Sequence, residues 1–432
     1  MYRRILALVL FIMSIVPCRP AAAEVQSAPV LAMSTMGAPI ADVTIETYGV
    51  VKPAEVFRYL SLRKGETLEK DAVDRDYLNL TKLGGFKVRM SIAQDPASGA
   101  VTLHWIVMAK AIAPTYHPYY LEEPLSPPIE GVGFVGKSRE LDSKGSDVAL
   151  STEFTRRADI VRGIYTRPLR VDPVKGRESQ FLVNVYGGKG DYRASEPYPA
   201  EIYSWSTAVQ LSYLQRSTNG TQLEFGVLSG RSSSDKPTYI VAPSMYDTYY
   251  KPARNTLLEA GVSHACPGPP TQWYPPYCYY QFRARVDDGI GGLGSTNEFQ
   301  AYNADVAQYT RVGSSTFALH GALWRSGGVI PTSFINCAAG LHGYPKAFCG
   351  TDSEIVQAEY RIDDALPHVI HFFLLGETAA SRVRGGNQYF VPSQFTWHSD
   401  YGYGVMYRTF RFDITHGAQG GRITYEFQGQ LF

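Results

Sequence analysis

From about residue 130 onward, short segments of the chain alternate between apolar and polar residues. Successive side chains of a β-strand point to opposite faces of its sheet, so each segment predicts a strand with one apolar and one polar face. The clearest segments are residues 203–213, 280–287 and 356–362. No helical segment or second layer is evident in the sequence that could cover so many apolar faces. The pattern therefore favours a membrane β-barrel, whose apolar face contacts lipid and whose polar face lines the interior.

Aromatic residues and net charge support this interpretation. Tyrosines gather near strand ends, for example Tyr401 and Tyr403, as they do in the aromatic girdles of membrane barrels. The alternative is a soluble β-sandwich or propeller, which would bury the apolar faces in a core, but no propeller repeat is visible. With 41 Lys+Arg against 40 Asp+Glu, the net charge of +1 argues against a nucleic-acid-binding protein.

Sixteen strands can be assigned within residues 129–432. Asn219 and Gly220 predict a tight hairpin between two of them. If the count is right, the two loops that carry cysteines follow the seventh and eleventh strands, so both open at the same, exterior end of the barrel. The predicted strand centres lie near residues 134, 150, 161, 183, 208, 225, 259, 284, 303, 320, 333, 358, 371, 405, 412 and 426.

The first 23 residues predict a secretory signal peptide. Two arginines precede the apolar run of residues 5–16, and three alanines at residues 21–23 suit the cleavage site. The apolar run is too short for the alternative, a membrane-spanning helix. Export to an oxidising compartment then favours two local disulfides, Cys266–Cys278 and Cys337–Cys349. A metal site is disfavoured, because neither pair has close Cys-x-x-Cys spacing.

Residues 39–110 have a different pattern and predict a small α+β domain. An alternating strand ends at Gly49, and an amphipathic helix follows it. A second amphipathic helix ends at Gly84, and two further alternating segments predict strands, so the predicted order is β-α-α-β-β. Residues 111–128 contain five prolines among tyrosines and predict a stiff linker.

Four short motifs follow one another in the last third of the chain. They are Leu341-His342-Gly343-Tyr344, Glu359-Tyr360-Arg361, Gly402-Tyr403-Gly404 and the terminal Phe432. Together with the β-α-α-β-β domain, they resemble the BamA/TamA superfamily, also called the bacterial surface antigen family, whose periplasmic modules are POTRA domains. The alternative for residues 39–110 is another small α+β domain. The resemblance implies a mainly β fold: a 16-stranded antiparallel transmembrane β-barrel over residues 129–432, preceded by a small β-α-α-β-β (POTRA-like) periplasmic domain.

The loop motif departs from the family pattern at one position. In the family, the loop carries an arginine that pairs with a carboxylate on a later strand, whereas this chain has His342. We expect the strand position to be Leu374, which has no charge, so the resemblance predicts that the usual ion pair is lost and that a Cys337–Cys349 bridge holds the loop instead. Glu359 and Arg361 share the inward parity and predict a structural ion pair rather than a catalytic site.

The resemblance implies a location in the bacterial outer membrane, with the N-terminal domain in the periplasm. The implied function is insertion, secretion or assembly of client proteins, with no enzymatic activity, cofactor or metal. A separate client would add a strand to the POTRA-like sheet edge and then pair at a weak seam between the last strand and the glycine-rich first strand. The predicted seam residues are Gly131, Gly133 and Gly136.

The other implied partners are the outer-membrane lipid bilayer and the barrel-assembly machinery, but no nucleic acid. That machinery would recognise the C-terminal segment for insertion of this chain, through Tyr425, Phe427 and Phe432. The alternative function is a passive outer-membrane channel or surface-exposed structural protein with the same fold. The absence of the loop arginine at residue 342 favours that alternative.

Overall fold

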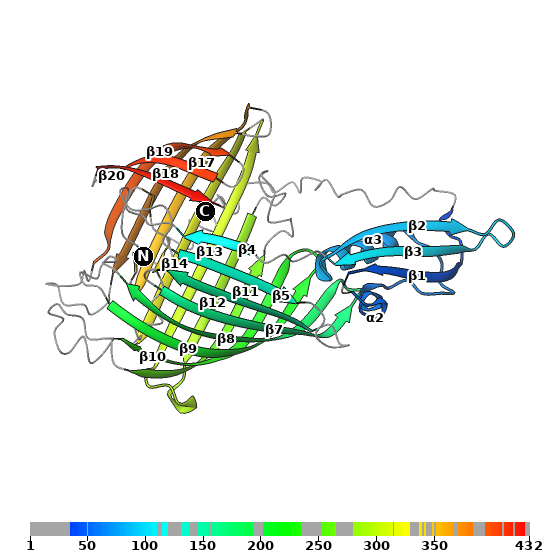
Figure 1. The fold of residues 1–432 in the computed structure, drawn as a ribbon, viewed down its shortest axis with the longest axis horizontal. Coiled ribbons are helices and arrows are strands. Elements are labelled where there is room, and N and C mark those ends of the chain that lie inside the picture. Colours follow the sequence, from blue (N-terminus) through cyan, green and yellow to red (C-terminus); the bar gives the residue numbers. More distant parts are fainter. Residues whose placement is uncertain are drawn as a thin grey trace.

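Two β-sheets of very different size dominate the structure, which is a computed structural model (Figure 1). The predicted signal peptide lies outside the described residues. No helix within the described part of the chain is long and apolar enough to cross a membrane. The structure describes residues 35–49, 51–109, 115–119, 131–138, 146–155, 158–192, 202–234, 252–264, 280–313, 315–328, 337–338, 341–342, 348–349, 351–366, 370–382, 394–407, 410–417 and 420–427.

The N-terminal unit, defined by the described residues between 35 and 109, is a three-stranded sheet with short helices. The sheet order is β1-β3-β2, with β1 parallel and β2 antiparallel to β3, and the predicted β-α-α-β-β order is confirmed. The elements are β1 (Ile40–Tyr48), α2 (Pro53–Val56), η2 (Phe57–Tyr59), α3 (Lys70–Leu78), η3 (Asn79–Leu83), β2 (Phe86–Gln94) and β3 (Val101–Ala109).

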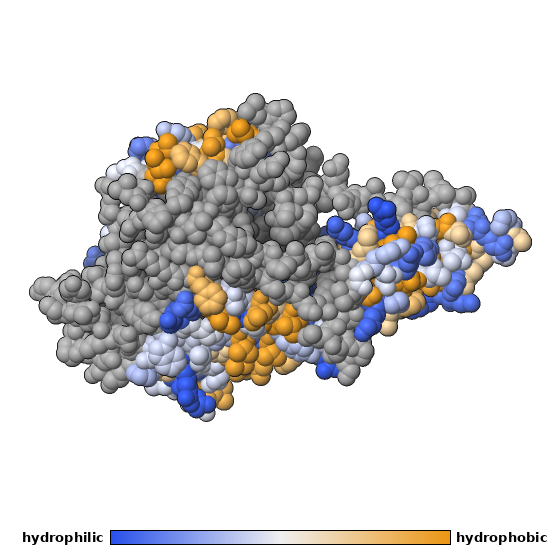
Figure 2. Space-filling view, viewed as in Figure 1, coloured by the Kyte–Doolittle hydropathy of each residue, from blue (hydrophilic) through white to orange (hydrophobic). Residues whose placement is uncertain are grey.

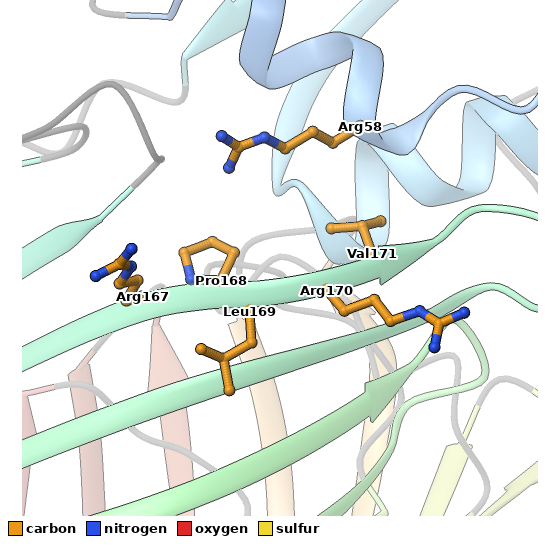
Figure 3. A pocket seen from close by; sticks show the side chains of 6 residues that line it. All are labelled: Arg58, Arg167, Pro168, Leu169, Arg170 and Val171. Carbon is orange, nitrogen blue, oxygen red and sulfur yellow. The ribbon is translucent and has the colours of Figure 1, made fainter.

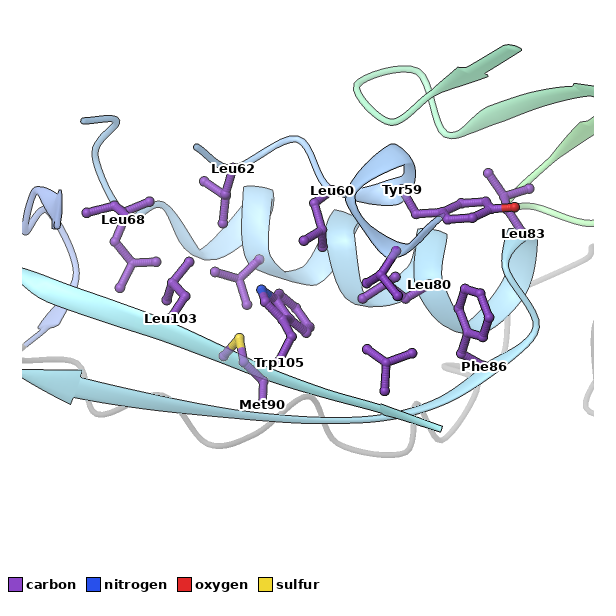
Figure 4. Close-up of a cluster of buried hydrophobic side chains, with 14 of the residues drawn as sticks. Tyr59, Leu60, Leu62, Leu68, Leu80, Leu83, Phe86, Met90, Leu103 and Trp105 are labelled. Atoms are coloured by element: carbon purple, nitrogen blue, oxygen red, sulfur yellow. The ribbon is translucent and has the colours of Figure 1, made fainter. Parts of the chain in front are cut away.

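The core of this unit lies between the helices and one face of the sheet (Figure 4). Trp105 on β3 and Phe86 on β2 are fully buried there, together with Leu60 and Leu80 from the helical layer. Asp76 on α3 accepts hydrogen bonds from the backbone N–H and the hydroxyl of Ser61, both at 2.6 Å, and from the N–H of Leu62 at 3.0 Å. These bonds satisfy the backbone of the segment between the two helices and fix it against α3.

The large sheet contains sixteen described strands in the order β21-β20-β19-β18-β17-β14-β13-β12-β11-β10-β9-β8-β7-β6-β5-β4. A separate short hairpin, β15 (Cys337–Ala338) with β16 (Phe348–Cys349), falls between β14 and β17, and η5 (Gly291–Leu293) connects β12 to β13. The strands of the large sheet are β4 (Thr115–Tyr119), β5 (Gly131–Ser138), β6 (Asp147–Thr155), β7 (Ala158–Asp172), β8 (Arg177–Tyr192), β9 (Ile202–Ser217), β10 (Thr221–Ser234), β11 (Ala253–His264), β12 (Tyr280–Gly289), β13 (Phe299–Val312), β14 (Ser315–Gly328), β17 (Asp352–Leu366), β18 (Ile370–Arg382), β19 (Thr396–Tyr407), β20 (Phe410–Gly417) and β21 (Gly420–Phe427).

Most of these strands lie where the sequence predicts them, but prediction and structure differ at two places. Fifteen of the predicted strand centres fall inside strands of the large sheet. The centre near residue 333 lies outside the described residues, and β14 pairs directly with β17. Conversely, Thr115–Tyr119 pairs with β5, so part of the predicted linker 111–128 belongs to the large sheet.

The extra strand β4 changes the expected edge of the sheet. The glycine-rich strand β5, which carries Gly131, Gly133 and Gly136, pairs with β4 on one side and with β6 on the other. The prediction that these glycines form the first strand is therefore wrong. In the described sheet, the edge strands are β4 and β21.

One end of the large sheet lies against the N-terminal unit (Figure 1). The side-chain amide of Asn79 donates to the carbonyl oxygen of Pro173, in the turn between β7 and β8, at 2.8 Å. The turn between β9 and β10 lies beside it, because the N–H of Thr218 donates to the carbonyl oxygen of Gly176 at 3.0 Å. We call this the unit end of the sheet, and the other the far end.

The two cysteine segments leave the sheet at different ends. β11 ends at His264, which pairs with Thr221 at the unit end, so the segment 265–279 begins there. Strands β11 to β14 alternate in direction, and β14 ends at Gly328, so the segment that follows β14 begins at the far end. The expectation that both cysteine loops open at one end is therefore wrong, because the predicted strand near residue 333 does not separate β14 from β17.

The large sheet has two chemically different faces, as the alternation predicts. On β9, Leu211 and Tyr213 are exposed, whereas their neighbours Gln210 and Ser212 are buried. Apolar side chains gather on parts of the surface of this sheet (Figure 2). We call the face with buried polar side chains the inner face and the other the outer face.

Candidate functional site

The loop motif is anchored to the inner face of the large sheet through His342. Its backbone N–H donates to Oε2 of Glu377 at 2.8 Å, and its ring nitrogen Nδ1 lies 2.7 Å from Oε1 of the same carboxylate. Leu341 packs in a small buried cluster with Ile355 of β17 and Ala379 of β18. Two polar contacts and one apolar contact therefore hold this part of the loop against β17 and β18.

This contact corrects the expectation that the loop has no charged partner on the strand. Leu374 has the opposite parity from Glu377 and is 59% exposed on the outer face. Glu377 lies three residues later in the same strand, faces inward and is buried. The loop of this chain therefore has an imidazole–carboxylate pair, which we call the loop lock.

The loop lock continues into a chain of hydrogen bonds across four strands. Gln357 on β17 donates from Nε2 to Oε1 of Glu377 at 2.6 Å. His320 on β14 lies between Oε1 of Gln357, 2.7 Å from its Nδ1, and Oδ2 of Asp305 on β13, 3.1 Å from its Nε2. The His320 ring therefore bridges Gln357 and Asp305 through its two nitrogens. The lock is thus part of a continuous polar network.

A second network joins β17 to β20. Glu359 accepts from Arg361 Nη2 at 2.8 Å and, through its other oxygen, from Arg411 Nη1 at 2.8 Å. All three side chains are buried. The predicted Glu359–Arg361 pair is present, and the sequence analysis missed Arg411. Its signal was available, since Arg411 alternates with Phe410 and Phe412 in a predicted strand.

The Gly-x-Gly motif on β19 leaves space for this second network. The guanidinium carbon of Arg411 lies 4.1 Å from the ring centroid of Phe373, a cation–π contact. A Cβ atom added at Gly404 would stand 2.5 Å from Cζ of that phenylalanine. Glycine at this position therefore lets the Phe373 ring lie over β19 and support Arg411.

A third network occupies β7 to β12. Glu259 pairs with Arg285, and Gln210 donates to Oε2 of Glu259 at 2.7 Å. Asn184 donates to Gln210 at 3.0 Å and accepts from Arg162 at 2.9 Å. The inner face therefore carries hydrogen-bonded charged groups along most of the sheet. Within the described ranges, no three His, Cys, Asp or Glu side chains are placed to hold a metal ion.

The remaining predicted site residues are only partly described. The backbone register places Cys337 directly opposite Cys349 in the β15–β16 hairpin. Tyr425 and Phe427 lie on β21, an edge strand of the large sheet. The other predicted residues lie outside the described residues: Gly343, Tyr344, Cys266, Cys278 and Phe432.

The N-terminal unit contacts the large sheet through buried polar groups, which the sequence analysis did not predict. The hydroxyl of Tyr59 donates to Oε1 of Glu178 on β8 at 3.0 Å, and both residues are buried. Val171 of β7 packs against the core of the unit. Together with the bond from Asn79 to Pro173, these contacts fix the unit at one end of the sheet.

Solved structures identify the fold. BamA from Haemophilus ducreyi lacking POTRA domains 1–3 matches with a TM-score of 0.63 and 13% identity, covering 90% of this chain and 84% of that chain. CdiB from Escherichia coli matches with a TM-score of 0.56 and 9% identity, covering 90% and 75%. CdiB from Acinetobacter baumannii matches with a TM-score of 0.50 and 12% identity, covering 90% and 74%. No protein-family model and no curated protein matches the sequence. The chain therefore has the fold of the BamA/TamA superfamily barrels.

Proposed function

We propose that this protein is an outer-membrane barrel that inserts or secretes client proteins. The observation that carries the proposal is the loop lock, His342 with Glu377, inside a fold shared with BamA and CdiB. Because the loop is held in one place on the inner face, it supports a role in handling client proteins inside the barrel rather than a passive channel. The alternative, a passive channel, was favoured only because the loop lacks an arginine at residue 342. The pair of His342 with Glu377 takes the place of that arginine, so this reason no longer holds.

We infer that the sheet closes between β4 and β21 into a sixteen-stranded barrel with a weak seam. β4 has only five residues, and one of them, Pro118, has no N–H to donate to a ladder. Neighbouring strands within the sheet are much longer, for example β8 with sixteen residues. A client strand could therefore replace the β4–β21 pairing at a smaller cost in hydrogen bonds than a pairing between two long strands such as β8 and β9.

In this mechanism the N-terminal unit acts as a POTRA-like domain in the periplasm. Its sheet has two edge strands, β1 and β2, to which an extended client could add by main-chain hydrogen bonds. The contacts of Tyr59 and Asn79 would keep that edge at a constant position relative to the barrel mouth. No covalent chemistry and no cofactor enters this mechanism.

The test is a deletion strain whose outer-membrane and secreted proteomes are compared with those of the parent. We expect a defined set of proteins to fall, and plasmid-borne wild type to restore them. In a background without the native cysteines, a disulfide between β4 and β21 should abolish the rescue. The matched control is Val183→Cys with Leu211→Cys, which links residues already paired in β8 and β9 and should rescue.

Two results would contradict the proposal. The first is an unchanged proteome in the deletion strain. The second is full rescue by the seam-linked variant. Conductance in planar bilayers that does not depend on the N-terminal unit would instead favour the passive channel.

We also propose that residues 1–23 are cleaved on export and that Cys337 and Cys349 form a disulfide. The second proposal is supported by their directly opposed positions in the β15–β16 register. Mass spectrometry of the mature protein, digested without reducing agent, tests both. It should give an N-terminus at Glu24 and a linked Cys337–Cys349 peptide.

A further inference from the structure

The N-terminal unit contacts the large sheet through its helical layer. Tyr59 of η2 and Asn79 of η3 make the hydrogen bonds already described. Between η2 and β7 lies a pocket of about 320 Å³, lined by Arg58 from the unit and by residues 167–171 of β7 (Figure 3). Neither edge strand of the unit's sheet, β1 or β2, takes part in these contacts (Figure 1).

The β1 edge is already covered at its start. The N–H of Ile40 donates to the carbonyl oxygen of Glu66, and the N–H of Gly65 donates to that of Ile40, both at 2.8 Å. The pairing of β1 with β3 also shifts between Ile40 and Asp42. A covering segment and a bulge are two means by which proteins keep an edge strand from pairing with another chain.

The β2 edge has neither of these features. Its register with β3 is continuous over all nine residues of β2, and the strand contains no proline. Among the described residues, no segment other than β3 pairs with β2. A flat and unpaired edge of this length can accept a further strand. Of the two edges of the unit, β2 is therefore the more open.

Backbone groups of alternate β2 residues point away from β3. The N–H of Asp95, just after β2, donates to the carbonyl oxygen of Ala100 at 2.9 Å, so these two residues form a hydrogen-bonded pair. Bonded and non-bonded pairs alternate along an antiparallel ladder. Counted back from Asp95, the residues that turn their N–H and C=O groups outward include Val88, Met90 and Ile92. In the part of the chain that the structure describes, those groups have no hydrogen-bond partner.

The same edge carries two basic side chains on the solvent face of the sheet. Lys87 and Arg89 are exposed and alternate with residues that pack against the core. Their cross-strand neighbours on β3 are apolar, Met108 and Ile106. Neither basic side chain forms an ion pair within the described ranges. A strand added to β2 would therefore place two of its residues opposite unpaired positive charges.

The acidic side chain in the same row does not neutralise these charges. Glu46 stands in register with Arg89, but on β1, two strands away, which is roughly 10 Å. Both of its oxygens have other partners, because Oε1 accepts from the hydroxyl of Tyr48 and Oε2 lies 3.2 Å from Nε2 of His104. Positive charge therefore gathers at the β2 edge.

We propose that the β2 edge accepts an extended segment of a client protein in which acidic residues alternate with apolar residues. The acidic side chains would lie opposite Lys87 and Arg89, and the apolar side chains would lie beside Val88 and Met90. The same two positive charges repel a basic strand, so they also select among partners. The inference rests on the proposed function, because it names the kind of client segment that the strand-addition step takes.

Peptide binding to the full-length protein in a neutral detergent tests the proposal. Three fluorescent peptides of the length of β2, nine residues, have valine at alternate positions and glutamate, threonine or lysine at the others. Fluorescence anisotropy measures the dissociation constant of each peptide. The glutamate peptide should bind about three- to tenfold more tightly than the threonine peptide, since two cross-strand charge pairs contribute about this factor. The lysine peptide should bind more weakly than both.

Reversal of the two charges gives a result that a misfolded protein does not give. The Lys87→Glu/Arg89→Glu variant should invert the order, so that the lysine peptide binds most tightly. The matched control is Lys64→Glu/Lys70→Glu, which makes the same change of charge on two exposed lysines, one before α3 and one at its first residue. The control should keep the order of wild type.

A backbone measurement separates strand addition from charge attraction alone. The glutamate peptide is N-methylated either at every valine or at every glutamate, and only one of these alternate sets can turn its N–H groups toward β2. One methylated peptide should therefore bind roughly tenfold or more weakly, because it loses several main-chain hydrogen bonds, and the other should bind like the unmodified peptide.

Three results would overturn the proposal. They are equal affinity of wild type for the glutamate and lysine peptides, an unchanged order in the charge-reversed variant, and equal affinity of the two methylated peptides. The peptide measurements use purified protein, whereas the proposed function is tested by the proteome of a deletion strain. An unchanged proteome would refute the proposed function without altering the order of the peptides, so the two failures are distinguishable.

Discussion

Replacing His342 with alanine should release the loop from the inner face. The substitution removes the ring contact to Glu377 at 2.7 Å and leaves the backbone N–H of residue 342 as the remaining donor from the loop. Breaking a buried ion pair on one side typically costs about 3–5 kcal/mol. In the variant, Glu377 still accepts a hydrogen bond from Gln357, so we expect a smaller loss of stability here, roughly 2–3 kcal/mol.

That energy corresponds to an increase of about 30-fold or more in the open population of the loop. The rate of limited proteolysis within residues 329–350 measures the population, with the protein folded in detergent micelles. Urea unfolding, followed by tryptophan fluorescence, measures the accompanying loss of barrel stability. Leu374→Ala is the control on the same strand, because its side chain is exposed on the outer face.

A double-mutant cycle isolates the pair. Glu377→Gln keeps the size of the side chain but removes its charge, and His342→Ala added to it should cost little more than Glu377→Gln alone. The coupling energy should be about 1.5–3 kcal/mol. Strict additivity, or a proteolysis rate in His342→Ala within twofold of wild type, would refute the reasoning that this pair holds the loop.

Three further outcomes are expected. Burial opposes the charge on His342, but its hydrogen bond to Glu377 and the charge of that carboxylate outweigh burial and raise the pKa of His342. The stability that the charged His342 gives the loop is therefore fully present below about pH 6.5 and is lost as pH rises through the higher folded pKa. Proteolysis rates across pH 5–9 would measure this loss. Arg411→Met should destabilise the barrel by about 3–5 kcal/mol in urea unfolding, because it leaves a buried glutamate of β17 with one arginine fewer. Gly404→Ala should cost about 1–3 kcal/mol in the same assay, since its Cβ would overlap the backbone oxygen of Phe412 on β20 as well as the buried Phe373 ring, whereas Gly376→Ala has open space and should cost much less.

The strands were predictable because their signal is local. A period of two needs only a few neighbouring residues, and β9 or β17 displays it without any knowledge of the rest of the chain. β4 was missed for the converse reason. It has five residues, includes Pro118 and lies in a proline-rich stretch, so its pairing with β5 comes from tertiary contact rather than from its own pattern.

The loop lock was missed because a shift between odd and even positions moves a side chain to the other face of the sheet. Leu374 was expected at the family position, but the inward set of β18 includes Phe373, Leu375 and Glu377. Alternation alone assigns Glu377 to the inner face. It does not reveal that a loop inserted after β14 comes within hydrogen-bonding distance, because that contact depends on the curvature of the whole sheet. The same holds for Arg411. Alternation along β20 predicts that its side chain faces inward, but it does not predict that Glu359 on β17 is its partner.

The loop lock also explains how histidine can stand where the resemblance leads one to expect arginine. An arginine offers two parallel N–H groups from the end of a long side chain, so its backbone can remain away from the carboxylate. Histidine is shorter, and here the backbone N–H of His342 supplies the second donor to Glu377 at 2.8 Å. The carboxylate still receives two hydrogen bonds from one residue, but only because the loop backbone itself lies against β18. His342→Arg should therefore keep the charge pair and yet move the loop backbone away from the strand. Hydrogen exchange at residue 342 would then become faster than in wild type, although the barrel remains as stable.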